Sequence, residues 1–287
     1  MSLIRKENDV NLEDLKGKAN DIRVDIVEMV AEAGSGHPGG SLSSVEILCA
    51  LYFGGVLDHD ASDPKKEDRD RFLLSKGHAA PVLYATLAES GYFPKEELKT
   101  LRKLHSRLQG HPDCRKLPGV EASTGSLGQG LSIAAGMACG LKLDGSEATV
   151  FTLMGDGECQ EGQVWEAAMF ASHRSLDNLV AILDHNHLQI DGRIEDVCCP
   201  DSFSAKFEAF GWQVFMCDGN DMEAVLATLE SAKDAKSGKP KIVIAETTKG
   251  KGVSFMEDQA GWHGKAPNAE QAEQAVAELT DKEALHG

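Results

Sequence analysis

Hydrophobic and polar positions follow two periods along this chain, and the two alternate from beginning to end. Residues 10–33 repeat apolar side chains at helical spacing. Short continuous apolar runs, which are typical of buried strands, occur at 71–75, 148–154, 179–183, 212–217 and 242–247. Further helices are predicted at 41–53 (with Ser41 as its cap), 80–90, 95–104, 131–143, 160–173, 221–233 and 269–285.

This alternation predicts an α/β fold, a doubly wound parallel sheet with helices on both faces. No repeat or linker interrupts the pattern. Residues 1–287 are therefore expected to form a single domain, with the helix at about 269–285 as its carboxy-terminal tail.

Polar residues follow two consecutive predicted strands in the middle of the chain. Gly155-Asp156-Gly157 follows the first strand, and Asn186 follows the second. Ligands of parallel α/β sheets bind beyond the carboxyl ends of the strands, so Asp156 and Asn186 are expected to be neighbours. Carboxylate and amide oxygens suit a hard cation such as Mg²⁺ or Ca²⁺, and glycines beside a helix start suit a phosphate. GDG alone would indicate only a tight turn, but together these features predict a metal and a diphosphate.

Four of the ten histidines lie beside glycine in predicted loops, namely His37, His78, His111 and His263. Imidazoles can donate, accept or transfer protons near neutral pH, so a cluster of them suits a substrate rich in hydroxyls with one carbonyl. Lone histidines such as His59, His173 and His286 are interpreted as structural. His185 and His187 flank Asn186, but no third Cys or His stands at a usable spacing, so no transition-metal site is expected there.

Composition narrows the possible partners. The formal net charge of −17 disfavours nucleic acid and anionic membranes. The seven cysteines form no C-x-x-C pair, which indicates reduced thiols. The start has no apolar signal core and no run is long enough to cross a bilayer, so a cytoplasmic protein is expected.

Six motifs occur in an order that resembles the amino-terminal domain of transketolases. They are GSGHPGG, SKGHA, QGHP, TGSLGQGL, the GDG-to-Asn segment and WHG. The resemblance implies a thiamine diphosphate-binding fold that carries Mg²⁺ or Ca²⁺. It implies that Asp156 and Asn186 bind the metal through side-chain oxygens, and that Leu188 binds it through its carbonyl. Asn186 would also belong to the cofactor site, and Gly157 would bind the diphosphate through its backbone.

The same resemblance implies roles for the other loops. His78 and His263 would lie near the diphosphate, and Gly125 and Leu127 would line the pyrimidine and thiazolium region. The catalytic residues would be His37, His111 and His263, which contact the sugar. Glu161 would be structural, at an interface. Ser126 departs from the family, which commonly has Pro there, and this difference should alter loop stiffness more than chemistry.

Transketolases continue into a second domain that binds the aminopyrimidine and supplies an activating glutamate, whereas this sequence ends at Gly287. The resemblance therefore implies the amino-terminal subunit of a split transketolase, inactive alone and assembled with a carboxy-terminal subunit, as an α₂β₂ heterotetramer. The implied reaction moves a two-carbon ketol unit from a ketose phosphate to an aldose phosphate, as in the pentose phosphate pathway.

Three alternatives remain beside this interpretation. One is a related thiamine diphosphate enzyme, either similar to deoxyxylulose phosphate synthase or a transketolase-like subunit for an unusual sugar. The second is a non-catalytic homologue, which the intact Asp156, Asn186 and loop histidines disfavour. The third is a P-loop or dinucleotide-binding protein, but neither fingerprint is present in the sequence.

Overall fold

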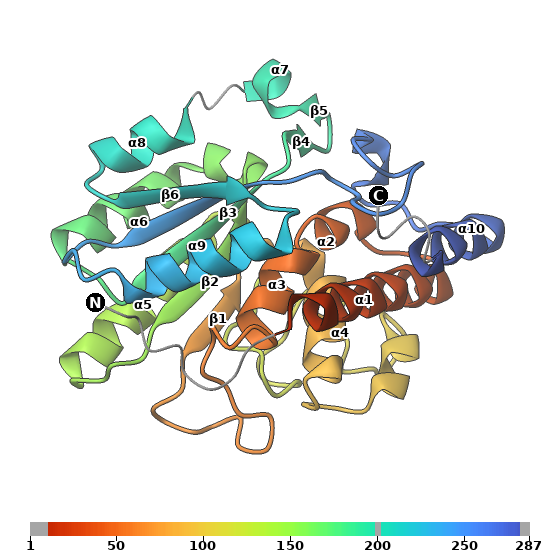
Figure 1. Ribbon diagram of the computed structural model, residues 1–287, viewed down its shortest axis with the longest axis horizontal. Helices are drawn as coiled ribbons and strands as arrows, with labels where there is room; N and C mark the ends of the chain where they lie inside the picture. Colours follow the sequence, from red (N-terminus) through yellow and green to blue (C-terminus); the bar gives the residue numbers. More distant parts are fainter. Residues whose placement is uncertain (1–10, 199–201, 282–287) are drawn as a thin grey trace.

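A five-stranded sheet forms the centre of the protein in the computed structural model, which describes residues 11–198 and 202–281 (Figure 1). Its strands are β1 (Arg71–Leu74), β2 (Val150–Gly155), β3 (Leu179–His185), β6 (Gln213–Asp218) and β7 (Lys241–Glu246). They lie in the order β1-β2-β3-β7-β6, and every neighbouring pair is parallel. The predicted parallel sheet is therefore confirmed.

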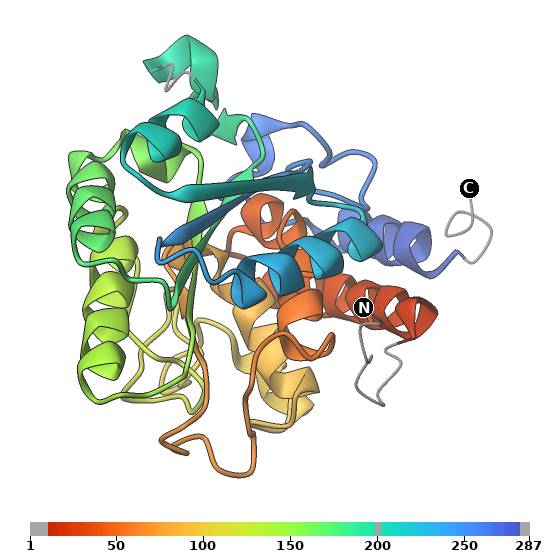
Figure 2. The same ribbon diagram turned by 60° about the vertical axis from the view of Figure 1, so that its left-hand side comes forward.

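Helices cover both faces of this sheet, as predicted. Alternate side chains of each strand enter different hydrophobic clusters; on β2, Phe151 and Leu153 enter one cluster, whereas Val150 and Met154 enter the other. The Val150 face packs under α5 (Gln129–Leu143), α6 (Gly162–His173) and α8 (Phe203–Ala209). The opposite face packs under α1 (Leu12–Ala33), α3 (Val45–Tyr52), α4 (Ala80–Glu89) and α9 (Met222–Asp234) (Figure 2). Because both faces are covered, the strands need apolar residues at nearly every position.

The first and last helices of the described chain lie side by side. α1 packs against α10 (Ala269–Thr280), and the Asn20 side chain donates to the Leu279 carbonyl (Figure 1). α1 ends at Gly34, whose φ of 60° is the left-handed conformation that commonly ends helices. This turn leads the chain directly into the loop of His37. The predicted tail helix is thus confirmed up to residue 280, and its residues 282–285 lie outside the described part.

Two helix predictions are wrong in detail. The single helix expected at 41–53 is divided into α2 (Pro38–Leu42) and α3. Pro38 starts α2 before residue 41, because the backbone N–H of a residue in the first turn of a helix has no partner within the helix and proline lacks that N–H. Ser41 is therefore not a cap; its hydroxyl lies inside α2 and donates to the His37 carbonyl at 2.7 Å. The helix expected at 95–104 is a shorter 3₁₀ helix, η2 (Lys95–Thr100).

The segment after β3 contains structure that the hydrophobic pattern had not indicated. A short antiparallel pair, β4 (Leu188–Gln189) and β5 (Gly192–Arg193), leads into α7 (Ile194–Cys198). None of the helices within 11–198 and 202–281 combines the length and the apolar character needed to cross a bilayer.

Candidate active site

The ends of β2 and β3 bring the predicted metal ligands together. Gly155 of β2 pairs with Asp184 of β3, so Asp156 lies against the turn that follows β3. The Asp156 carboxylate is buried and accepts the N–H of His187 at 2.6 Å and that of Gly157 at 2.7 Å. Burial, aided by the charge of Asp184, raises the pKa of Asp156 to about 6. This carboxyl gains an obvious stabilisation from a cation, because a cation favours its ionised form.

The Asn186 amide is held in one orientation by its neighbours. Its Nδ2 donates to Asp184 Oδ2 at 2.8 Å, and its Oδ1 accepts the Leu188 N–H at 3.2 Å. The amide nitrogen is therefore directed at the buried carboxylate. The oxygen is left on the side of the turn that carries Leu188, which the sequence predicts as another metal ligand.

Asp184 is the centre of a fully buried charged network. The Lys76 ammonium forms an ion pair with it, and Ser43 donates its hydroxyl at 2.8 Å. The Thr247 hydroxyl donates to the other carboxylate oxygen. Burial opposes ionisation of Asp184, but the charge and hydrogen bond of Lys76 outweigh it and hold the pKa of this carboxyl below its usual value.

Lys249 approaches the same region from the end of β7. Its ammonium donates to the Leu188 carbonyl at 2.9 Å and lies 2.9 Å from Nδ1 of His263. Burial lowers the pKa of Lys249 to about 8. The Leu188 carbonyl, which the sequence predicts as a metal ligand, thus already accepts a hydrogen bond. The buried ammonium of Lys249 lies beside the turn that carries Asn186. Such a cation suits an anionic group.

The four loop histidines form one cluster. The ring centroid of His37 lies 5.3 Å from that of His78, 6.3 Å from that of His111 and 5.5 Å from that of His263. His78 belongs to the 3₁₀ helix η1 (Gly77–Ala79), and His263 follows η4 (Ala260–Trp262). Four segments that are far apart in the sequence therefore converge, as their glycine-rich contexts predicted.

These imidazoles are held in their neutral form. Burial lowers the pKa of His37 to about 4 and that of His263 to about 3, and nearby cations act in the same direction. Burial also lowers the pKa of His78 and His111. At neutral pH each ring therefore offers one N–H donor and one acceptor nitrogen, which suits hydroxyl and carbonyl groups.

Glycines allow these loops to approach each other. A Cβ at Gly39 would lie 3.0 Å from the Trp262 carbonyl, and one at Gly125 would lie 2.9 Å from a ring carbon of His111. Gly125 also has a φ of 142°, a conformation that other residues rarely adopt. Gly39 and Gly125 therefore allow the loops of the cluster to pack closely.

The buried Glu158 joins three of the loops. It lies in η3 (Gly157–Gln160), where its carboxylate accepts the Gly128 N–H at 2.9 Å and the Gly155 N–H at 3.1 Å, together with the Ser75 hydroxyl. This carboxylate fixes the TGSLGQGL loop against the end of β2.

Some predicted residues lie further from these contacts. Leu127 is half-buried, whereas Ser126 and Glu161 are exposed, and the Glu161 side chain makes no capping bond at the start of α6. Gly157 donates its N–H to Asp156, so its role in diphosphate binding stays a prediction.

Sequence reasoning missed Lys76, Asp184, Glu158 and Lys249. A signal existed, because Lys76, Asp184 and Lys249 stand at or just beyond the carboxyl ends of β1, β3 and β7. The rule that ligands bind beyond strand ends applies to these three residues as it does to Asp156 and Asn186.

The donors present fit both a hard cation and a diphosphate. The Asp156 carboxylate contacts the turn that carries the Asn186 amide oxygen and the Leu188 carbonyl, and Mg²⁺ prefers oxygen ligands. The buried ammonium of Lys249 beside them would offset anionic charge.

Together, the sheet order and the strand-end site define a parallel α/β domain of the thiamine diphosphate-binding type. Residues 15–283 match the family described as "Transketolase, thiamine diphosphate binding domain", and the chain belongs to this family. The transketolase of Campylobacter jejuni superposes with a TM-score of 0.87 at 38% identity, over 94% of this chain and 43% of that one. The chain thus spans less than half the length of that solved transketolase.

Two curated relatives are similar over nearly their whole length. An apulose-4-phosphate transketolase subunit from Actinobacillus succinogenes is 46% identical over 274 residues, which cover 95% of this chain and 98% of the relative. The 6-deoxy-6-sulfo-D-fructose transketolase subunit SqwG of a Clostridium species is 45% identical over 266 residues, which cover 93% and 96%.

Proposed function

We propose that this chain is the diphosphate-binding subunit of a two-chain transketolase that transfers a two-carbon ketol unit from a ketose to an aldose. The observation that carries this proposal is the convergence of two elements at one edge of the sheet. One is the oxygen-rich turn around Asp156 and Asn186, and the other is the cluster of four neutral histidines.

The cofactor in this proposal is thiamine diphosphate with Mg²⁺, or Ca²⁺ in its place. Asp156, Asn186 and the Leu188 carbonyl would hold the metal, and Gly157, His78 and Lys249 would surround the diphosphate. Gly125 and Leu127 would line the region of the cofactor rings. When bound, the cofactor supplies a nucleophilic carbon and accepts the electrons of the broken carbon–carbon bond.

The histidines would position and polarise the sugar. His37 and His263 are neutral, so either can donate an N–H to the carbonyl oxygen and hold or move the proton of the hydroxyl formed there. His111 is exposed at the edge of the cluster and would hold a terminal hydroxyl of the donor. The buried network of Asp184 would keep Asn186 oriented without touching the sugar.

A second subunit is part of the proposal. The relatives from Actinobacillus and Clostridium are each named as one subunit of a transketolase, and this chain covers nearly all of both. The partner would bind the aminopyrimidine side and supply the activating glutamate, in an α₂β₂ assembly.

The sugars are proposed by class. Ketose and aldose phosphates suit the site, as in ordinary transketolases. A specialised sugar is a second candidate, because the relatives' names refer to apulose 4-phosphate and to 6-deoxy-6-sulfo-D-fructose.

Reconstitution tests this proposal. The purified chain should bind thiamine diphosphate only with a divalent metal, in calorimetry, and should not turn over a ketose phosphate alone. Turnover should appear when a carboxy-terminal transketolase subunit, to be sought in the neighbouring reading frame, is added. Full activity of the isolated chain would refute the two-chain assignment. An assembled pair that is inert toward ordinary ketose phosphates, apulose 4-phosphate and 6-deoxy-6-sulfo-D-fructose would refute the reaction.

A further inference from the structure

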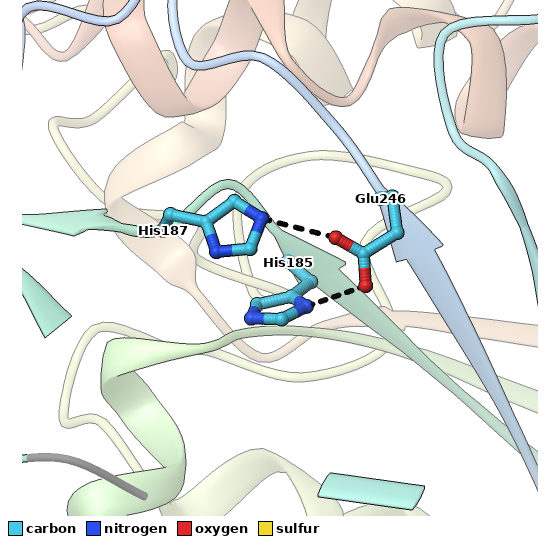
Figure 3. Close-up of side chains that lie close together, drawn as sticks. All are labelled: His185, His187 and Glu246. Carbon is cyan, nitrogen blue, oxygen red and sulfur yellow. Dashed lines mark hydrogen bonds and ion pairs between the residues drawn. The ribbon is translucent and has the colours of Figure 1, made fainter. Parts of the chain in front are cut away.

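A second group of potential metal ligands lies at the carboxyl end of β3 and β7. His185 is the last residue of β3 and pairs in register with Glu246, the last residue of β7 (Figure 3). Glu246 contacts both imidazoles: His185 Nδ1 lies 2.7 Å from one carboxylate oxygen, and His187 Nε2 lies 3.0 Å from the other. The ring centroids of the two histidines are 4.0 Å apart.

This cluster is distinct from the candidate active site. Asp184 and His185 are successive residues of β3, so their side chains point to opposite sides of the strand. Asp184 meets Lys76 and the Asn186 amide, whereas His185 and His187 both meet Glu246. The ring of His185 rests edge-on against Phe203, at the start of α8. None of the three ligand side chains contacts the four clustered loop histidines.

The chemistry of the cluster is that of a transition-metal site. Two imidazoles and one carboxylate form the protein ligand set of many zinc centres that keep an open position. One potential ligand atom from each side chain can be chosen so that the three lie within 4.8 Å of one another. Zinc–nitrogen bonds of about 2.0–2.1 Å in a tetrahedron place ligands about 3.4 Å apart, so the ion would need to draw them together only slightly.

The cluster is also open to solvent and ready to exchange ligands. It lines a cavity of about 300 Å³ together with Ile194, Ser202 and Met216. Within the described chain, the second nitrogen of neither ring has a hydrogen-bond partner, so each ring can carry its proton there while the nitrogen that faces Glu246 binds an ion. The cavity leaves room for a water molecule in the fourth position.

We infer that His185, His187 and Glu246 bind a divalent transition-metal ion, for which Zn²⁺ is the reference. Glu246 holds both rings in place before the ion arrives, which reduces the cost of ordering them. No local pattern in the sequence indicates this ligand set, because Glu246 stands far from the two histidines along the chain and meets them only through the pairing of β3 with β7.

This site is independent of the proposed reaction but is physically connected to the candidate active site. The backbone N–H of His187 donates to Asp156, and Asn186 stands between the two histidines. An ion bound to both imidazoles would therefore fix the turn that presents Asn186 and Leu188.

The experiment is a titration of the full chain with Co²⁺ in excess Mg²⁺, followed by visible absorption, with Zn²⁺ displacement followed by calorimetry. Excess Mg²⁺ occupies the oxygen ligands of Asp156. The spectrum separates imidazole and carboxylate ligation from binding by the cysteines, because thiolate ligands add a charge-transfer band. We expect one equivalent of Co²⁺ with no thiolate band, displaced by one equivalent of Zn²⁺.

Three variants and two controls decide the outcome. Glu246→Gln and His185→Gln should each weaken Zn²⁺ binding at least about tenfold. His187→Asn should do the same while suiting the backbone, because residue 187 has a φ of 63°, which Asn tolerates well. His173→Gln, a matched change at an exposed histidine of α6, should leave Zn²⁺ binding unchanged. Asp156→Asn should do so too, because it removes the charge but keeps an oxygen that can accept the His187 N–H.

The inference is overturned if the unaltered chain takes up no equivalent of Co²⁺, or if its spectrum shows thiolate ligation. It is equally overturned if folded Glu246→Gln and His187→Asn chains bind Zn²⁺ within twofold of the original, or if Asp156→Asn alone removes the binding. Near-native circular dichroism establishes that each variant is folded.

Discussion

Replacing Lys76 with Met should be one of the most costly single changes in this protein. The ammonium of Lys76 is buried, pairs with the fully buried Asp184, and donates to the Gly40 carbonyl at 2.8 Å and to the Ser44 hydroxyl at 2.7 Å. Methionine keeps most of the hydrocarbon stem but leaves the Asp184 carboxylate without its counter-charge.

The size of the effect follows from this uncompensated charge. Removing one partner of a buried ion pair costs about 3–5 kcal/mol. With a urea dependence of about 3 kcal/mol/M, the midpoint of unfolding should fall by about 1–1.7 M. The assay is urea unfolding of the cofactor-free chain, followed by circular dichroism. Affinity for Mg²⁺ and thiamine diphosphate should fall as well, because Asp184 orients the Asn186 amide.

Two comparisons test the reasoning. Lys142→Met removes an exposed lysine that pairs with Asp177 at 2.6 Å, and should cost less than about 1 kcal/mol. In the double variant Lys76→Met with Asp184→Asn, neither member of this ion pair is left as an unpaired charge, so its cost should fall short of the sum of the single costs by about 1–3 kcal/mol. If Lys76→Met costs no more than Lys142→Met, or if the double variant is strictly additive, the charged network does not have the role assigned to it.

Other consequences of the site can be measured separately. Asp156→Ala should abolish metal-dependent binding of thiamine diphosphate in calorimetry; unchanged affinity would remove Asp156 from the metal site. Because the pKa of Asp156 is raised to about 6, a metal must displace its proton at lower pH, so Mg²⁺-dependent affinity should fall about tenfold per unit below pH 6. Above pH 6 it should stay constant until Lys249, whose pKa is about 8, loses its charge; a flat profile down to pH 5 would contradict this. His263→Ala should lower kcat of the assembled enzyme by about 10²–10⁴-fold with little change in cofactor affinity, and an unaltered rate would exclude His263 from the reaction. Gly125→Ala places a Cβ 2.9 Å from the His111 ring and strains the backbone, so thermal denaturation should show a loss of about 1–3 kcal/mol; a variant as stable as the original would show that the loop relaxes freely.

The fold was largely predictable because strand and helix periods differ clearly in this chain. The continuous apolar runs at β2, β3 and β7 require a sheet covered on both faces, and that is what forms. The division between α2 and α3 was not visible, since both flanking segments are apolar and entirely buried. The pair β4 and β5 is too short for any period to appear.

The candidate site was predictable where residue type and strand position coincide, as at Asp156 and Asn186. The histidine cluster could be anticipated from its glycines, but not the neutral state of its members, which depends on burial and on the cations that the fold places nearby. The contacts of Lys249 with Leu188, and of Glu246 with the histidines at the end of β3, could be predicted only by knowing which strand lies next to β3. That order, with β7 inserted between β3 and β6, is not encoded locally.

The packing of α1 on α10 has a consequence for biosynthesis. Asn20 meets Leu279 only after 259 further residues have been made, so the first helix waits through most of translation for one of its partners. His37 and His263 stand at the inner ends of these same two segments. During synthesis the nascent polypeptide thus exposes part of the apolar face of α1 until residue 280 has left the ribosome, and the two imidazoles cannot meet before residue 263 has emerged. Because contacts between residues so distant in sequence form late, we expect the emerging chain to expose apolar surface to which a chaperone can bind.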